Sequence, residues 1–146
     1  MRFMMLVMPK SFEWGRVEKD PDAMPDAELA AAMMKYNDEL AKAGVLLGLE
    51  GLHSPASAAR VTFKNGKATV TDGPFAEAKE VLGGYWMIKV NSREEAIAWA
   101  RRIPGTENEM VEVRQVREID EFPEDVQKAH GGLDEIKAAL ARNAKG

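Results

Sequence analysis

The dipeptide Asn65-Gly66 constrains this sequence most, because it separates two segments in which polar and apolar residues alternate. The segments read ARVTFK before it and KATVT after it. Asn-Gly tolerates the positive φ angles of a type I′ turn, which joins two antiparallel strands through a two-residue loop. The spacing therefore predicts a β-hairpin in which Lys64 lies opposite Lys67. Because side chains alternate along a strand, one face of this hairpin is expected to be apolar, with Val61, Phe63, Ala68 and Val70 on it.

The segments on either side of the hairpin alternate between strand and helix patterns. Apolar residues at helical spacing predict a first helix that begins at Asp26 and ends at Gly44, and a second that begins at Ser92 and ends at Pro104. Four further strands are expected at residues 2–8, 45–52, 83–90 and 110–117. Without the hairpin, the order is the split βαβ plan of ferredoxin-like domains. The expected fold class is therefore α+β, a ferredoxin-like sheet with an inserted β-hairpin.

The first strand, RFMMLVM, is apolar on both faces. Two helices can cover only one face of a four-stranded sheet, so the other face needs a second cover. The economical cover is a second copy of the same sheet, packed about 10 Å away. The sequence thus predicts a homodimer that closes into a dimeric α+β barrel.

Two segments lie outside the core plan. Residues 9–25 contain three prolines and are expected to form an exposed loop. Residues 118–146 read as two helical pieces interrupted at Gly131-Gly132, and the apolar stripe of the second piece needs a surface to bury against. We therefore expect one domain over residues 1–117, and a helical extension over 118–146 that packs on the domain or on its dimer partner.

Composition excludes several classes of function. The net charge is −4 and the 20 basic residues are scattered, which argues against nucleic-acid binding. No apolar run approaches the roughly 20 residues of a membrane span. The chain has no cysteine and two histidines, so no metal site is expected. The start of the chain reads as a strand rather than a signal peptide, and we expect a cytoplasmic protein.

Several longer stretches resemble a known family. AGVLLGLEGLHSP, VTDGPFAEAKEVLGGYWMIKV, and AIAWARRIP followed by VEVRQV are similar to the DGPF-type branch of the YCII-related proteins, over residues 2–117. The resemblance implies a dimeric α+β barrel, in a superfamily of small isomerases, monooxygenases and haem-dependent enzymes. It also implies an uncharacterised function, and because many members of this branch are encoded beside extracytoplasmic-function sigma factors, association with such a factor is one expected partnership. No residue pattern in this chain specifies a cofactor, so none is expected.

Asp72 is the residue that matches the family's motif directly. YCII-type proteins are suspected enzymes because a histidine and an aspartate share a cleft, but the corresponding helix here, MMKYNDEL, contains no histidine. An aspartate before Gly-Pro also suits a turn, in which its side chain accepts from its own backbone. The hairpin register places Asp72 on the apolar face, where a carboxylate has to be paired, protonated or poised for proton transfer. Both interpretations remain open at this point.

Other candidates are weaker. Glu50 interrupts an apolar strand, so it either lines a polar interior or lies beside a sheet edge, and His53 supplies the imidazole nearest to the sheet. Both join Asp72 as candidate catalytic residues, although a structural role is the simpler explanation for His53. Surface charge is the simpler explanation for most of the candidate ligand contacts. Those candidates are Arg60, Glu77, Lys79 and Tyr85.

Two functions fit these observations. The first is a small, cofactor-independent enzyme that acts on a small organic metabolite, with Asp72 as general acid or base and Glu50 or His53 assisting. The second is a non-catalytic dimeric module that senses a ligand or associates with a sigma factor through its tail.

Overall fold

The structure is a computed structural model that describes residues 1–146 except 18, 77, 106, 108 and 146. The chain divides into two compact units, Met1–Val116 and Arg117–Gly146.

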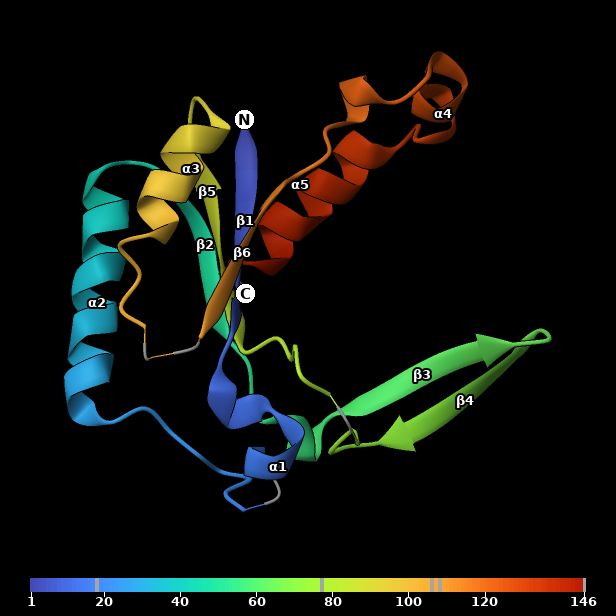
Figure 1. Ribbon diagram of the computed structural model, residues 1–146. Coiled ribbons are helices and arrows are strands. Elements are labelled where there is room, and N and C mark those ends of the chain that lie inside the picture. The colour runs from blue at the N-terminus through green and yellow to red at the C-terminus, as the bar shows by residue number, and fades with distance from the viewer. Residues whose placement is uncertain (18, 77, 106, 108, 146) are drawn as a thin grey trace. The chain divides into compact units, whose positions relative to one another are not determined.

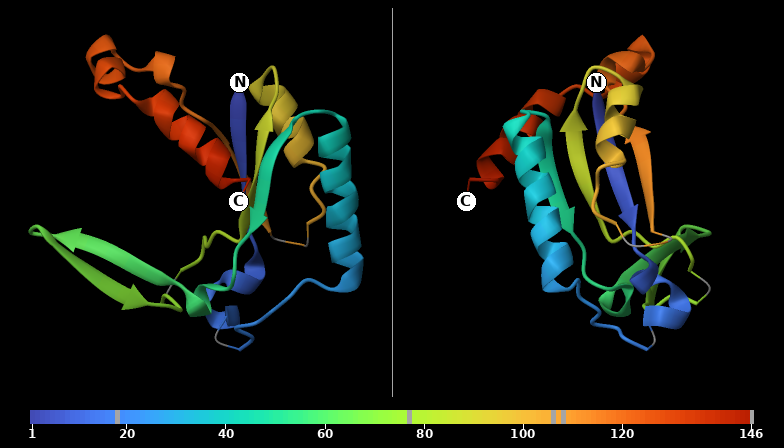
Figure 2. Two further views of the ribbon diagram at one scale, coloured as in Figure 1. Left: turned by 180° about the vertical axis from the view of Figure 1, so that it is seen from behind. Right: turned by 60° about the vertical axis from the view of Figure 1, so that its left-hand side comes forward.

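The first unit is built on a four-stranded antiparallel sheet in the order β2-β5-β1-β6 (Figure 1). Its strands are β1 (Arg2–Met8), β2 (Leu46–Gly51), β5 (Gly84–Lys89) and β6 (Met110–Gln115). The helices α2 (Ala27–Lys42) and α3 (Arg93–Ala100) connect β1 to β2 and β5 to β6, and Figure 2 shows both helices on one side of the sheet. This is the ferredoxin-like α+β fold that the sequence predicts.

The core lies between these two helices and one face of the sheet. Tyr36 and Leu40 of α2 and Ala96 of α3 pack against the alternate strand residues Phe3, Met5, Trp86 and Ile88. Neighbouring strands are in register on this face, with Phe3 opposite Ile88 and Met5 opposite Trp86. The opposite face carries Met4 and Leu6, which lie opposite Met87 and Tyr85. The first strand is therefore apolar toward both faces, as its sequence indicates.

The ends of α2 and α3 follow from local chemistry. The carboxylate of Asp26 accepts from the backbone N–H of Leu29 at 2.8 Å and caps the first turn of α2. Gly44 follows that helix with φ of +71°, a conformation that glycine adopts without a Cβ clash. The Ser92 hydroxyl accepts from the backbone N–H of Glu95 at 3.1 Å at the start of α3.

The hairpin consists of β3 (Ala59–Lys64) and β4 (Lys67–Asp72), which form a separate two-stranded sheet (Figure 1). Lys64 lies opposite Lys67, and both Asn65 and Gly66 have positive φ. The predicted register is thus confirmed. However, every residue of the two strands is exposed, so the apolar face of the hairpin faces solvent in the protomer.

The segment between β1 and α2 differs from the expected exposed loop. It contains a 3₁₀ turn at Lys10–Phe12 and the short helix α1 (Trp14–Val17). The side chains of Phe12 and Val17 are buried. The prolines interrupt regular structure, as expected, but these two apolar side chains hold part of the segment against the rest of the unit.

The second unit contains two α-helices, α4 (Glu124–Ala129) and α5 (Leu133–Asn143), separated by Gly131-Gly132. Gly132 has φ of +91° and is the N-cap of α5. Ile136 and Leu140 of α5 are 58% and 61% exposed. None of the helices that the described residues form is both long and apolar enough to cross a membrane.

Candidate functional site

A cavity of about 980 Å³ opens in the first unit, at the end of the sheet where β2 ends and β5 begins. Apolar side chains form much of its wall, and they come from α2, from the segment before it and from the edge of the sheet. These are Phe12, Met24, Leu29, Met33, Leu49, Leu52 and Trp86. The lining also includes polar and charged side chains, among them Lys10, Ser11, Arg16, Asn37, Glu50, His53, Ser54, Ser57 and Tyr85. Apolar walls with a few polar groups are typical of small-molecule sites.

Two glycines shape the floor of this cavity. A Cβ at Gly83 would lie 2.5 Å from Cδ of Pro9, and a Cβ at Gly84 would lie 2.7 Å from the carbonyl oxygen of Glu50. Real Cβ atoms do not approach other heavy atoms so closely. The Gly83-Gly84 pair therefore lets the start of β5 pack directly against the end of β2 and the residue after β1.

The cavity brings together three of the residues singled out from the sequence. Glu50 lies near the end of β2, opposite Tyr85 of β5, and His53 follows two residues after the strand. The side chains of Glu50 and His53 are exposed, and neither forms an ion pair or hydrogen bond with another described residue. Both are available to a bound molecule.

Asp72, Arg60 and Lys79 do not line the cavity. Asp72 lies at the end of β4 opposite Ala59, and its side chain is exposed. Its carboxylate accepts no hydrogen bond from the described residues, so the turn forms without the side-chain contact expected from its sequence. Arg60 places its guanidinium 3.8 Å from the centre of the Phe75 ring, and Lys79 is exposed. Glu77 lies outside the described residues.

The tetrapeptide Asp72-Gly73-Pro74-Phe75 has a visible structural role. The backbone N–H of Gly73 donates to the carbonyl oxygen of Ala58 at 2.7 Å. A Cβ at Gly73 would lie 1.9 Å from the carbonyl oxygen of Pro55. The glycine thus lets the chain that leaves β4 cross directly over the turn that precedes β3.

One residue of the cavity escaped the sequence reasoning. Asn37 accepts a hydrogen bond from Nε1 of Trp86 at 2.7 Å, and both residues line the cavity. The signal was present in the sequence, because Asn37 follows Leu29 and Met33 at four-residue intervals. Residues at this spacing lie along the same side of a helix, so Asn37 is a polar residue in an otherwise apolar row.

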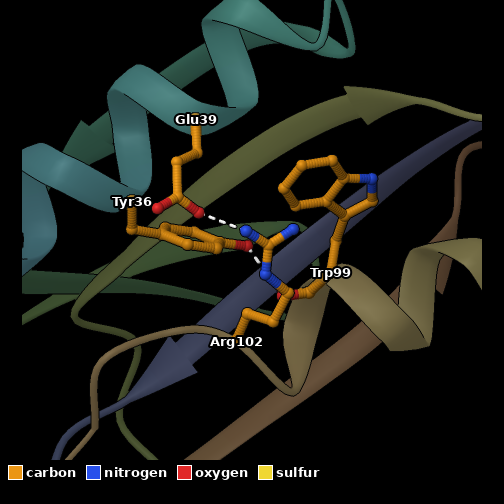
Figure 3. Close-up of polar contacts among 4 residues, drawn as sticks. All are labelled: Tyr36, Glu39, Trp99 and Arg102. Atoms are coloured by element: carbon orange, nitrogen blue, oxygen red, sulfur yellow. Dashed lines mark hydrogen bonds and ion pairs between the residues drawn. The ribbon is translucent and has the colours of Figure 1, made fainter.

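A cluster beside Asn37 fastens α2 to the end of α3 (Figure 3). The Tyr36 hydroxyl donates to the backbone carbonyl of Trp99 at 2.9 Å. Arg102 forms an ion pair with Glu39 and lies over the Trp99 ring, 4.4 Å from its centre. Burial raises the pKa of Tyr36 to about 12, so its hydroxyl stays protonated and remains a donor at neutral pH.

Among the residues that the structure describes, no group of three or more His, Asp or Glu side chains is arranged to hold a metal ion. The polar groups of the cavity are carboxylate, imidazole, amide, hydroxyl, ammonium and guanidinium. These groups can bind an organic ligand through hydrogen bonds, and imidazole and carboxylate can also exchange protons with it.

The fold defines a class of small ferredoxin-like α+β proteins with an inserted hairpin. Residues 1–120 match the YCII-related domain, and the chain belongs to that family. An uncharacterized protein of Rhizobium meliloti (strain 1021) is 38% identical over 88 residues, which are 60% of this chain. The match spans 65% of that protein, slightly less than two thirds of its length.

Proposed function

We propose that the protein binds a small, largely apolar organic molecule in the cavity at the end of the sheet. The observation that supports this proposal is the combination of apolar walls with the side chains of Glu50 and His53, which have no partner among the described residues. A ligand of that kind buries its body against side chains such as Met33 and Trp86. Its polar group then meets the few hydrogen-bonding side chains, which orient it.

We further propose that Glu50 and His53 transfer protons to and from this ligand. Both side chains line the cavity, and histidine is the residue type best suited to proton exchange near neutral pH. Asp72 is left out of this site, because its exposed carboxylate does not line the cavity. The acidic residue of the proposed enzyme is therefore Glu50, and not Asp72 of the Asp-Gly-Pro-Phe motif.

A thermal-shift screen of small metabolites tests the binding proposal, because a ligand that binds only the native state raises its stability. A ligand present at 100 times its Kd adds about 2.7 kcal/mol. Chemical shifts of the ¹⁵N-labelled protein then locate the bound molecule. We expect the largest changes at residues that line the cavity, and changes confined to α5 or the hairpin would refute this location.

NMR can follow the chemical conversion of each ligand found in the screen, and the rates in variants test the roles of the proposed residues. We expect Glu50→Gln or His53→Gln to lower the rate of conversion about 100-fold or more, the usual contribution of a general acid or base. Asp72→Asn is the matched control and should leave the rate unchanged. The assignment is wrong if Asp72→Asn abolishes conversion while the two cavity variants retain it.

A second candidate is a non-catalytic module that senses the same ligand and associates with a partner such as a sigma factor. The exposed Ile136 and Leu140 on α5 favour it, because exposed apolar side chains on one helix suit contact with another protein. The same experiment distinguishes the candidates. Binding in the cavity without conversion of any hit by the wild-type protein would favour the module.

We also propose that the protein is a homodimer. The support comes from β1, which directs Met4 and Leu6 to the sheet face opposite the helices. Two such faces can pack against each other and remove these side chains from water. Sedimentation equilibrium should give twice the 16.1 kDa mass of one chain, and a single-chain mass at all concentrations would exclude the dimer.

A further inference from the structure

We propose that Asn37 determines the specificity of the cavity, and that the ligand carries a carbonyl or carboxylate oxygen that accepts a hydrogen bond from the Asn37 amide. This inference depends on the proposed binding function and adds the chemical class of the ligand. It begins with the orientation of one side chain.

The hydrogen bond with Trp86 fixes which end of the amide is free. An indole N–H can only donate, so the atom that it meets at 2.7 Å has to be the Asn37 oxygen. The amide nitrogen consequently lies on the other side of the group. None of the described residues accepts a hydrogen bond from it, and no described side-chain nitrogen or oxygen is both buried and without a hydrogen-bond partner. The Asn37 amide nitrogen is therefore reached by solvent, and Asn37 lines the cavity. We infer that its N–H donors face the cavity.

Trp86 is itself held firmly, so the amide has a rigid support. Only 7% of Trp86 is exposed, and its ring meets the Tyr36 ring edge to face at 5.5 Å between centres. Tyr36 is anchored in turn by its hydrogen bond to Trp99. A donor that is oriented before the ligand arrives loses little entropy on binding, which favours selective recognition.

The neighbours of Asn37 indicate what surrounds the acceptor. Leu29 and Met33 lie one and two turns earlier on the same side of α2, and both line the cavity. They offer an apolar surface next to a single pair of N–H donors. The arrangement fits an apolar molecule that ends in an acceptor group. A donor group on the ligand cannot pair with the Asn37 nitrogen, because two donors cannot pair.

Three probes with the same apolar body test this inference on the full ¹⁵N-labelled chain. They are 2-naphthoate, 2-acetylnaphthalene and 2-ethylnaphthalene, which carry a carboxylate, a carbonyl and no acceptor. We expect the acid, the ketone or both to bind at least about tenfold more tightly than the hydrocarbon, the usual effect of one good hydrogen bond. Tighter binding of the acid would identify an anionic ligand, and tighter binding of the ketone a neutral one.

The variant Asn37→Asp tests ligand recognition without removing the contact to Trp86. It retains a side-chain oxygen that accepts from the Trp86 indole and removes the N–H donors. We expect the indole N–H of Trp86 to remain protected from exchange with solvent in this variant, and the preference for the acid and the ketone to be lost. Asn143→Asp makes the same change of charge on the exposed surface of α5 and should preserve the preference. Loss of this protection in Asn37→Asp would contradict the orientation of the amide, and an undiminished preference would contradict its role.

The failures of the two proposals can be distinguished. Equal binding of all three probes in the cavity would overturn the role of Asn37 and leave the proposed binding function intact. If none of the naphthyl probes binds, both the apolar-ligand function and the inference that depends on it are overturned.

Discussion

Replacing Gly73 by alanine is expected to lower the free energy of unfolding by about 3 kcal/mol, at the upper end of the usual cost of forcing a larger side chain into a packed site. The physical reason is the 1.9 Å separation between the position of the new Cβ and the carbonyl oxygen of Pro55. That oxygen belongs to the backbone, so no side-chain rotation relieves the clash. The chain must move instead, and the hydrogen bond from Gly73 to Ala58 moves with it.

Urea unfolding of the variant measures this cost, with Gly48→Ala as its control. Nothing lies within 4 Å of a Cβ at Gly48, so we expect a change within about 0.5 kcal/mol there. A Gly73→Ala protein as stable as the wild type would show that the backbone crossing is not tightly packed. The result also bears on function, because it tells whether the Asp-Gly-Pro-Phe tetrapeptide is needed to hold the base of the hairpin.

Leu40→Ala is expected to cost about 3 kcal/mol, within the range measured for buried leucines. The Leu40 side chain is completely buried on the inner side of α2, where it packs with the core residues of the sheet. Its truncation removes apolar contacts and leaves a cavity that the neighbouring side chains fill only in part. Since α2 also carries Leu29, Met33 and Asn37, the position of this helix matters for the proposed site.

Met34→Ala on the same helix is the control for this prediction. The Met34 side chain is 67% exposed, and we expect its removal to change stability by less than about 0.5 kcal/mol. Guanidinium unfolding of both variants gives the comparison. Similar losses in the free energy of unfolding for Leu40→Ala and Met34→Ala would mean that α2 does not pack on the sheet through the face that carries Leu40.

Asp72 illustrates why a site is harder to predict than a strand register. The alternation of side chains correctly places Asp72 on the same face of the hairpin as Val70, because it depends only on neighbours in the chain. Which surface covers that face depends on contacts outside the hairpin. In the protomer the face is exposed, so the environment expected for the carboxylate is absent there.

The sequence alone determined the local elements and their order. Asn65-Gly66 determined the hairpin and its register, Asp26 and Gly44 bounded α2, and the β-α-β-β-α-β order outside the hairpin determined a ferredoxin-like sheet. Each of these depends on interactions between near neighbours or on a simple period. Such interactions can be read along the chain.

Only the tertiary structure decided which side chains share a cavity. The bond between Trp86 and Asn37 joins residues 49 positions apart, so the spacing along α2 indicates the side of the helix on which Asn37 lies but not its partner. Glu50 and His53 were candidates from sequence, but their place in one cavity with Asn37 follows from the pairing of β2 with β5 and the packing of α2 on the sheet. A cavity forms where neighbouring elements leave space between their side chains. Its position therefore depends on how those elements pack in three dimensions.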